Sequence, residues 1–369
     1  MAASRNMEFR STALGSDPAP WSDHAVLWEM STSRCPFQSP AILRHFNRST
    51  DETKRMFALY RDGVAIGAVI FKQDGSGNLT FLSDLKTDVN RFLFHREADD
   101  AEKTFFFDEL LRSVREEDLS LTLNNQLGDH EDTALLERCT NAAGLYIKVL
   151  PNSACPVVEA ASPEELFKHV NGLRELRYRV NKLRNQKDAE FEVFTDTTDL
   201  DAWVDEYCAT HVRRWSGTPT PSNLRHPHRR DFLKGCLHAW AEDGSLVRFS
   251  IRVAGARIGF VIALRAPDTL IHHSTTYDPE HAKNSPGKAL LPHLAGWMAE
   301  NGYRILDFGD GREDYKYTVA TGERPLARIF IANKSNLRFI VSSSVIRLVK
   351  GNRFAYDVYQ RHIKPRMKA

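Results

Sequence analysis

The chain has 369 residues. This is longer than an ordinary domain with one hydrophobic core, so the length indicates two domains. Hydrophobic residues make up 42% of it and charged residues 27%, a balance that excludes an intrinsically disordered chain. The net charge of +2 lacks the basic excess of many nucleic-acid-binding proteins, so we expect no nucleic-acid partner.

The cysteines and the apolar runs narrow the class of protein further. No run approaches the ~18 consecutive apolar residues of a membrane span, and the N-terminus lacks the apolar segment of a signal peptide. The cysteines are odd in number, scattered and without a Cys-x-x-Cys pair, which argues against a disulfide framework and a zinc site: Cys35, Cys139, Cys155, Cys208 and Cys236. We therefore expect a cytoplasmic enzyme.

The first domain is predicted from residue 23 to residue 153. Residues 1–22 are small, polar and proline-containing, which indicates a flexible lead-in. Ser39 and Pro40 are typical of the cap and first turn of a helix, and Asp62-Gly63 predicts a hairpin. The expected elements are a helix at Ala41–Phe46, the hairpin strands Met56–Tyr60 and Val64–Phe71, a helix at Phe105–Val114, a strand at Asp118–Leu123, a helix at Asp132–Ala143 and a strand at Tyr146–Leu150.

The second domain is predicted from residue 154 to residue 335, after a boundary strand and linker at Pro151–Pro156. The order of elements resembles that of the first domain, which indicates a duplication and a mixed α/β sheet. The expected helices are Arg174–Arg184, Leu200–Trp215 and Arg229–Glu242, and the expected strands are Glu190–Thr195, Leu246–Val253, Arg257–Arg265, Thr269–Tyr277, Tyr303–Phe308 and Ala327–Ile331. Residues 336–369 are predicted to form a basic helical segment, interrupted near Gly351.

A helix start follows the strand Thr269–Tyr277 at Ser285-Pro286-Gly287-Lys288. The first turn of a helix presents free backbone N–H groups and the positive end of the dipole, so it can hold a phosphate. Gly287 permits close approach, and Lys288 adds a charge. An ordinary helix start explains the same residues, and Pro292 predicts either a kink or a later effective start.

A glycine-rich loop, Asp307-Phe308-Gly309-Asp310-Gly311, follows the next strand and leads to Tyr315-Lys316. Sites in open α/β sheets form at this end of the strands. An exposed surface turn is the alternative. A metal at Asp307 and Asp310 is not expected, because no histidine or further carboxylate lies at ligand spacing.

Taken together, these motifs resemble the second domain of acyltransferases of the GNAT superfamily, in particular the cellulose-biosynthesis-type (BioF2-like) branch. The resemblance covers roughly residues 25 to 335 and rests on Pro36-Phe37-Gln38-Ser39-Pro40, Leu173-Arg174-Glu175-Leu176-Arg177, Arg213-Arg214-Trp215, Ser285-Pro286-Gly287 and Asp307-Phe308-Gly309-Asp310-Gly311-Arg312-Glu313-Asp314-Tyr315-Lys316. It implies tandem GNAT-like domains, the first degenerate.

The resemblance also implies an acyl-CoA co-substrate, such as acetyl-CoA, held by Ser285, Gly287, Lys288 and Ala289. The family's usual pyrophosphate loop reads Arg/Gln-x-x-Gly-x-Gly/Ala. This chain has Lys283-Asn284-Ser285-Pro286-Gly287-Lys288-Ala289, without the leading Arg or Gln and with a proline inside.

In the related Fem-type peptidyltransferases, a Phe-Lys pair stands where this chain has Tyr315-Lys316. The resemblance implies that Lys316 stabilises the oxyanion of acyl transfer, and losing such a group costs on the order of 10²–10³ in rate. Asp278, His273 and Tyr315 are candidates for moving protons. Trp215, His273 and Asp307 are expected near the acceptor, although a tryptophan or histidine at such positions also serves packing.

We therefore expect an N-acyltransferase that acts on a small-molecule or sugar amine, and the resemblance suggests polysaccharide or envelope biosynthesis. The alternatives are a Fem-like transfer from aminoacyl-tRNA and a catalytically silent module of a synthesis complex. The segment Arg347–Lys368 carries seven basic residues and one acid, which suits either a solvated helix or contact with an anionic membrane or a synthesis complex.

Overall fold

The computed structural model describes residues 6–15, 17–84 and 86–351. The first half contains β1 (Met7–Ala13), α1 (Ala19–Met30), η1 (Pro36–Gln38), α2 (Pro40–Arg48), β2 (Thr53–Arg61), β3 (Val64–Gln73), β4 (Asn78–Phe81), β5 (Leu93–Phe94), α3 (Asp100–Glu116), β6 (Ser120–Leu127), α4 (Glu131–Ala142) and β7 (Tyr146–Glu159). The predicted Asp-Gly hairpin is confirmed as β2 and β3, with Asp62 and Gly63 at positive φ in the turn.

The second half contains α5 (Pro163–Gly172), α6 (Arg174–Lys187), β8 (Glu190–Phe194), α7 (Leu200–Trp215), η2 (Asn223–Arg225), α8 (Pro227–Glu242), β9 (Leu246–Val253), β10 (Ala256–Arg265), β11 (Thr269–Tyr277), η3 (Pro279–Asn284), α9 (Pro286–Glu300), β12 (Ile305–Asp307), α10 (Asp314–Tyr317), β13 (Gly322–Ala332) and α11 (Leu337–Gly351). The helical segment predicted for residues 336–369 is described only as far as Gly351, and its remainder lies outside the described residues.

Residues 7–13 differ from the predicted lead-in, because they form the edge strand β1 and pair with β2 in antiparallel register. The alternation of side chains along this short strand explains why it joins the sheet. Met7 and Phe9 are partly buried against the core of the first half, and the ring of Phe9 lies 5.8 Å from that of Phe106. A strand with one apolar face can pack that face on the core and so join the edge of the sheet.

Within the described residues, the strands form one sheet in the order β1-β2-β3-β4-β6-β13-β7-β12-β11-β10-β9-β8, with β5 attached to β3. Two units share one order of elements: β2-β3-β4-α3-β6-α4-β7 and β9-β10-β11-α9-β12-α10-β13. This repetition agrees with the predicted duplication, and the mixed α/β fold is confirmed.

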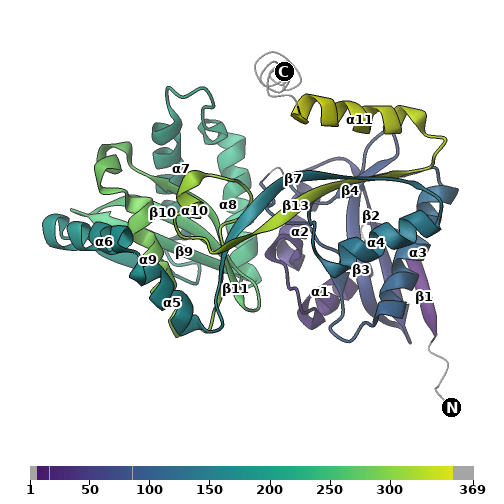
Figure 1. Ribbon diagram of the computed structural model, residues 1–369, viewed down its shortest axis with the longest axis horizontal. Coiled ribbons are helices and arrows are strands. Elements are labelled where there is room, and N and C mark those ends of the chain that lie inside the picture. The colour runs from purple at the N-terminus through teal and green to yellow at the C-terminus, as the bar shows by residue number, and fades with distance from the viewer. Residues whose placement is uncertain (1–5, 16, 85, 352–369) are drawn as a thin grey trace.

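The last strands of the two units are exchanged. β6 of the first unit pairs with β13, and β12 of the second unit pairs with β7. β7 and β13 also pair with each other from Gly322↔Val157 to Ala332↔Tyr146, and Figure 1 shows them crossing from one half of the molecule to the other. The predicted boundary between residues 153 and 154 therefore lies inside a strand that belongs to both units.

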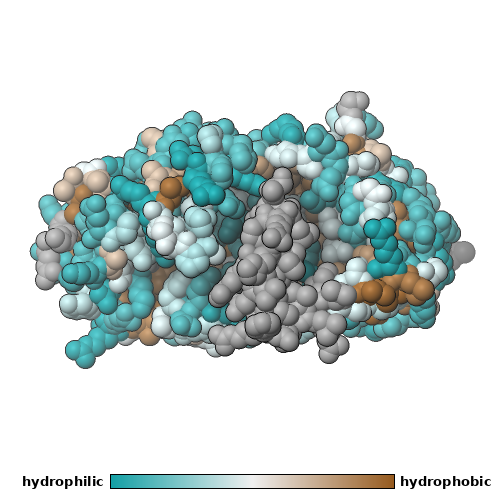
Figure 2. Space-filling view, turned by 90° about the horizontal axis from the view of Figure 1, so that it is seen from above, coloured by the Kyte–Doolittle hydropathy of each residue, from teal (hydrophilic) through white to brown (hydrophobic). Residues whose placement is uncertain are grey.

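Three large cores follow from the alternation of side chains along the strands. One lies under α1, α2, α7 and α8 and contains residues of both units, such as Ile70 and Ile262. The others lie on the α3/α4 side of the first unit and the α5/α6/α9 side of the second. On the face that Figure 2 shows, hydrophilic residues dominate both halves, with small separate apolar patches.

Candidate functional site at the divergence of β11 and β12

The centre of the second unit opens where two parallel strands separate. β11 pairs with β12 over only three residues, from Thr269↔Ile305 to Ile271↔Asp307. β12 then ends, while β11 continues to Tyr277. Beyond Ile271, no strand among the described residues pairs with the edge of β11 that faces away from β10, so a ligand could pair with backbone groups there.

Arg214, at the end of α7, covers this edge. Its guanidinium donates to the Thr275 carbonyl over 3.2 Å and lies 4.1 Å from the ring centroid of Tyr277. The Asp278 N–H donates toward β10, to the Ile258 carbonyl, so the alternation of peptide groups turns the Thr275 carbonyl the other way. Arg214 is part of a sequence motif, but the sequence indicated no such role for it.

The start of α9 lies at the far end of β11. Ser285 takes a left-handed conformation with φ of 49°, and its side chain makes no capping hydrogen bond. The Lys288 N–H donates to the Ser285 carbonyl, and Pro286 has no N–H. The amide of Gly287 is the remaining donor of this turn, so the helix start offers fewer donors to an anion than an ordinary one.

The other residues predicted to bind the co-substrate have different surroundings. Lys288 forms an ion pair with Glu175 of α6 at 2.8 Å. Ala289 is fully buried and belongs to the core rather than to a surface that a ligand could touch. Pro292 lies inside α9, which runs unbroken from Pro286 to Glu300, and the apolar face of this helix is packed in the core.

Lys316 is buried, with 6% of its side chain exposed. Its ammonium group donates to the carbonyls of Gly309, Asp310 and Gly311 over 3.4, 3.1 and 3.3 Å. It also pairs with Glu313 at 2.9 Å. These acceptors satisfy the three N–H donors of a lysine, so Lys316 holds the glycine-rich loop in shape and is not the exposed residue of a surface turn.

Tyr315 precedes Lys316 in the short helix α10. Burial raises the pKa of its hydroxyl, and Glu313 acts in the same direction. The positive charge of Arg214 opposes this shift of the Tyr315 pKa. The hydroxyl therefore stays protonated at neutral pH.

Asp278 and Trp215 lie on the α7 side of the opening. The Asp278 carboxylate accepts from Arg213 over 2.9 Å and caps η3 at the Glu280 N–H. The Trp215 ring stacks on His211, at 6.0 Å between centroids, and its indole N–H is buried without a partner among the described residues. Asp278 thus ties α7 to the loop before α9.

Asp307 is the last residue of β12 and is 5% exposed. Burial raises the pKa of its carboxyl to about 6, although the Gly309 N–H, which donates to it over 2.8 Å, acts against the shift. Arg324 lies 3.9 Å away and also lowers this pKa. Asp307 therefore organises the same loop as Lys316.

His273 makes a contact that no sequence motif indicated, because its partner belongs to the first unit. Its Nδ1 lies 2.7 Å from the Oδ2 of Asp88. Asp88 stands in the loop between β4 and β5, among residues without a recognisable pattern, so the sequence carries no signal for this pair.

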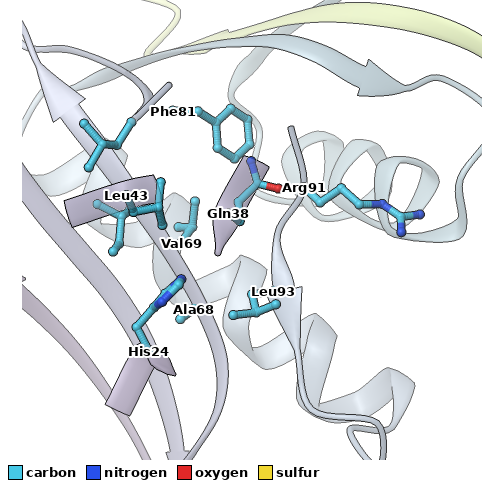
Figure 3. Close-up of a pocket in the computed structure, with 10 residues that line it drawn as sticks. His24, Gln38, Leu43, Ala68, Val69, Phe81, Arg91 and Leu93 are labelled. Carbon is cyan, nitrogen blue, oxygen red and sulfur yellow. The ribbon is translucent and has the colours of Figure 1, made fainter. Parts of the chain in front are cut away.

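The described cavities lie away from the opening. One of about 320 Å³ lies along the C-terminal half of α9 and is lined by Phe167, Asn171, Val180, Arg184, Val193, Pro292, His293, Gly296, Trp297 and Glu300. The other, of about 10 Å³, is inside the first unit, where Figure 3 shows His24 and Gln38 among its walls. It has room for about one water molecule, and burial lowers the pKa of His24 to about 4.

A metal centre has no support in residues 6–15, 17–84 and 86–351, because no group of three or more metal-ligating side chains occurs among them. No helix in the part of the chain that the structure describes is long and apolar enough to cross a membrane.

Comparisons with known proteins bear on this geometry. Residues 171–317 match the family model described as an acetyltransferase (GNAT) domain. No curated protein matches the sequence. Among solved structures, FemX is 12% identical with a TM-score of 0.60, and the match covers 90% of this chain and 99% of FemX.

Two further structures resemble the whole chain. The C-terminal domain of a protein described as a lysylphosphatidylglycerol synthetase from Agrobacterium fabrum is 10% identical, with a TM-score of 0.59 and coverage of 90% of this chain and 97% of that one. A conserved protein of unknown function from Bacteroides thetaiotaomicron is 14% identical, with a TM-score of 0.57 and coverage of 89% and 100%. Residues 171–317 are thus similar to a GNAT acetyltransferase domain, and the chain as a whole has the Fem-related GNAT-like fold.

Proposed function

We propose that this protein transfers an acyl group from an acyl-CoA thioester to a primary amine. The observation that carries the proposal is the unpaired edge of β11 beyond Ile271, inside the domain that matches the GNAT acetyltransferase model. The thioester arm lies along this edge. There it replaces Arg214 as the hydrogen-bond donor to the Thr275 carbonyl. The pyrophosphate lies at the start of α9, against the Gly287 amide and the charge of Lys288.

In the proposed reaction, the nitrogen of the amine attacks the thioester carbonyl. The N–C bond forms, the C–S bond breaks, and the proton of the amine passes to a base. Backbone N–H groups of the β11 edge stabilise the oxyanion, because donors fixed in place are effective for this purpose. Tyr315, whose hydroxyl stays protonated, donates to the leaving thiolate.

Lys316 has a positioning role in this proposal. Its donors are occupied by the carbonyls of the loop 309–311, so it acts on the reaction through the shape of that loop and through its charge. Asp278 and Trp215 place the end of α7 against the acceptor side, and Asp307 supports the same loop from β12.

Acetyl-CoA binding is the first test. A ligand at 100 times its Kd stabilises the folded state by about 2.7 kcal/mol, so saturating acetyl-CoA should raise the melting temperature clearly. Isothermal titration gives the stoichiometry, which we expect to be one per chain because, within the described residues, the long unpaired strand edge belongs to the second unit. A folded protein that is not stabilised by millimolar acetyl-CoA would sink the proposal.

The acyl donor and the amine acceptor are identified in separate experiments. A Fem-like transfer from aminoacyl-tRNA is the competing activity, since FemX shares the fold. Charged tRNA that competes with acetyl-CoA, or serves as donor when acetyl-CoA does not, would favour that activity. With labelled acetyl-CoA, a panel of amino sugars and small amines then identifies the acceptor, which by resemblance we place in polysaccharide or envelope synthesis.

A further inference from the structure

His273 occupies a β-bulge at the mouth of the opening. In the register of β10 and β11, Ile262 pairs with Ser274 and Ala263 pairs with His272, so His273 has no partner on β10. The bulge lies just past Ile271, the last residue that pairs with β12. Bulges re-aim a side chain, and this one turns the imidazole toward the first unit.

Two aromatic rings fix the plane of the imidazole. Phe37 meets it edge-on at 5.4 Å and 61°, and Trp240 meets it at 5.4 Å and 74°. The Trp240 indole N–H donates to the Pro36 carbonyl over 3.0 Å, which joins α8 to the 3₁₀ turn η1. The Pro36-Phe37 motif therefore acts at the second unit's site, as one wall of the His273 pocket.

Asp88 of the first unit completes the arrangement. Its Oδ2 lies 2.7 Å from Nδ1 of His273, and its Oδ1 accepts from the Asp310 N–H over 3.1 Å. The two side chains are 8% and 10% exposed. A Cβ at Gly309 would lie 2.8 Å from Asp88 Oδ2, so the glycine-rich loop needs a glycine at that position to admit the carboxylate.

The loop that carries Asp88 is held on both sides. The Asn125 amide donates to the Thr87 carbonyl over 2.9 Å, and the Gln126 amide donates to the Asn90 carbonyl over 2.6 Å. Both amides belong to β6, a central strand of the sheet. Asp88 is thus placed by the rigid part of the first unit.

We propose that Asp88 and His273 form the proton-accepting pair of the transfer reaction, with the first unit supplying the residue that orients the base. The inference rests on the proposed function. A carboxylate at Nδ1 selects the tautomer with its proton on that nitrogen, which leaves the lone pair of Nε2 free. Nε2 takes the proton from the amine as the N–C bond forms, and the imidazolium is stabilised by Asp88. The proton then leaves His273 to solvent, while Tyr315 protonates the thiolate and regains a proton from solvent.

Asp88→Asn provides a test of the orienting role that does not need a known acceptor. The Asp310 N–H is always a donor, so it retains the amide oxygen of the new side chain. The amide NH₂ then faces His273 and requires Nδ1 to accept, which moves the ring proton to Nε2. Nitrogen-15 NMR of the imidazole should show Nδ1–H in the natural protein and Nε2–H in the variant. The same tautomer in both proteins would overturn the orienting role.

The catalytic role is tested with acetyl-CoA and the best amine of the panel. His273→Ala and Asp88→Asn should each lower kcat by about 10²–10⁴ while acetyl-CoA binding stays within twofold, because general base catalysis has that size. Imidazole added to His273→Ala should restore part of the rate in a saturable way, which a merely structural histidine would not allow. Asp84→Asn, in the same loop, is the matched control and should keep the natural rate.

The outcomes separate the two proposals. Natural kcat in Asp88→Asn, or a His273→Ala variant that binds acetyl-CoA but gains nothing from imidazole, would overturn the catalytic pair and leave the acyltransferase standing. A protein that neither binds acetyl-CoA nor transfers from it overturns the proposed function together with this catalytic role. The NMR measurement then still decides whether Asp88 sets the tautomer.

Discussion

The two units differ most clearly at the helix that follows their third strand. In the first unit, α3 begins with a capping box in which the Asp99 side chain accepts from the Glu102 N–H and the Glu102 side chain accepts from the Asp99 N–H. In the second unit, α9 begins at Ser285 without a side-chain cap and with Lys288 in its first turn. The acidic start of α3 repels an anion, while Lys288 gives the start of α9 a positive charge.

The third strands of the two units differ as well. β4 has four residues and pairs with β6 over two of them, whereas β11 has nine residues and continues well past β12. Within the described residues, the first unit therefore lacks a long free strand edge like that of β11. It retains a core, a share of the exchanged strands, and Asp88 and Phe37. In the proposed reaction, the first unit supports the site of the second unit through these two residues.

The largest expected effect tests whether the units are separate at all. Phe106→Ala removes a fully buried ring from the first unit's core and should lower the free energy of unfolding by about 3–5 kcal/mol. Because β7 and β13 are exchanged, both units should unfold in one transition, measured by circular dichroism and tryptophan fluorescence in urea. Val64→Ala, at an exposed site, is the control. Two resolved transitions, with only one shifted, would show that the units fold independently.

The next effect concerns the loop that only the second unit builds around a buried cation. Lys316→Met keeps the length of the side chain but removes its hydrogen bonds to the loop 309–311, and should destabilise the protein by about 2–4 kcal/mol. Lys283→Met, at an exposed lysine, should change the stability little. A Lys316→Met variant as stable as the natural protein would return Lys316 to the role of a free catalytic cation.

A smaller effect has a pH dependence. The pKa of Asp307 is raised to about 6 by burial, above its ordinary value of 3.8, so its contribution to stability is intact below about pH 4 and is lost as the pH rises through 6. Asp307→Asn, whose oxygen can still accept from Gly309, should be more stable than the natural protein by roughly 1–3 kcal/mol at pH 7.5. The difference should vanish near pH 3.5. Equal unfolding curves at pH 7.5 would contradict this.

The smallest effect compares the two helix starts directly. Lys288→Gln should weaken acetyl-CoA binding by roughly two- to fivefold at low salt, since a surface charge at a helix start contributes about 0.3–1 kcal/mol. The loss should shrink in high salt. Lys103→Gln, in the first turn of α3, should leave the Kd unchanged. If both variants weaken acetyl-CoA binding equally, the prediction that the start of α9 and not that of α3 binds acetyl-CoA is wrong.

The sequence by itself determined the local elements. The helix Leu200–Trp215 and the strands Leu246–Val253 and Thr269–Tyr277 have the predicted bounds, because their apolar periodicity and flanking glycine or polar residues act over a few neighbours. The predicted Asp-Gly hairpin is confirmed for the same reason. The family's motifs also led to the correct fold.

Tertiary structure alone decided how these pieces form a site. β1 needed the core of the first unit to become a strand, and β7 could be recognised as shared only once its partners on both sides were known. Asp88 meets His273 across 185 positions of the chain, at a bulge that depends on the register of β10. Hydrogen bonds of this kind are set by packing between distant segments, and no local pattern of residues encodes them.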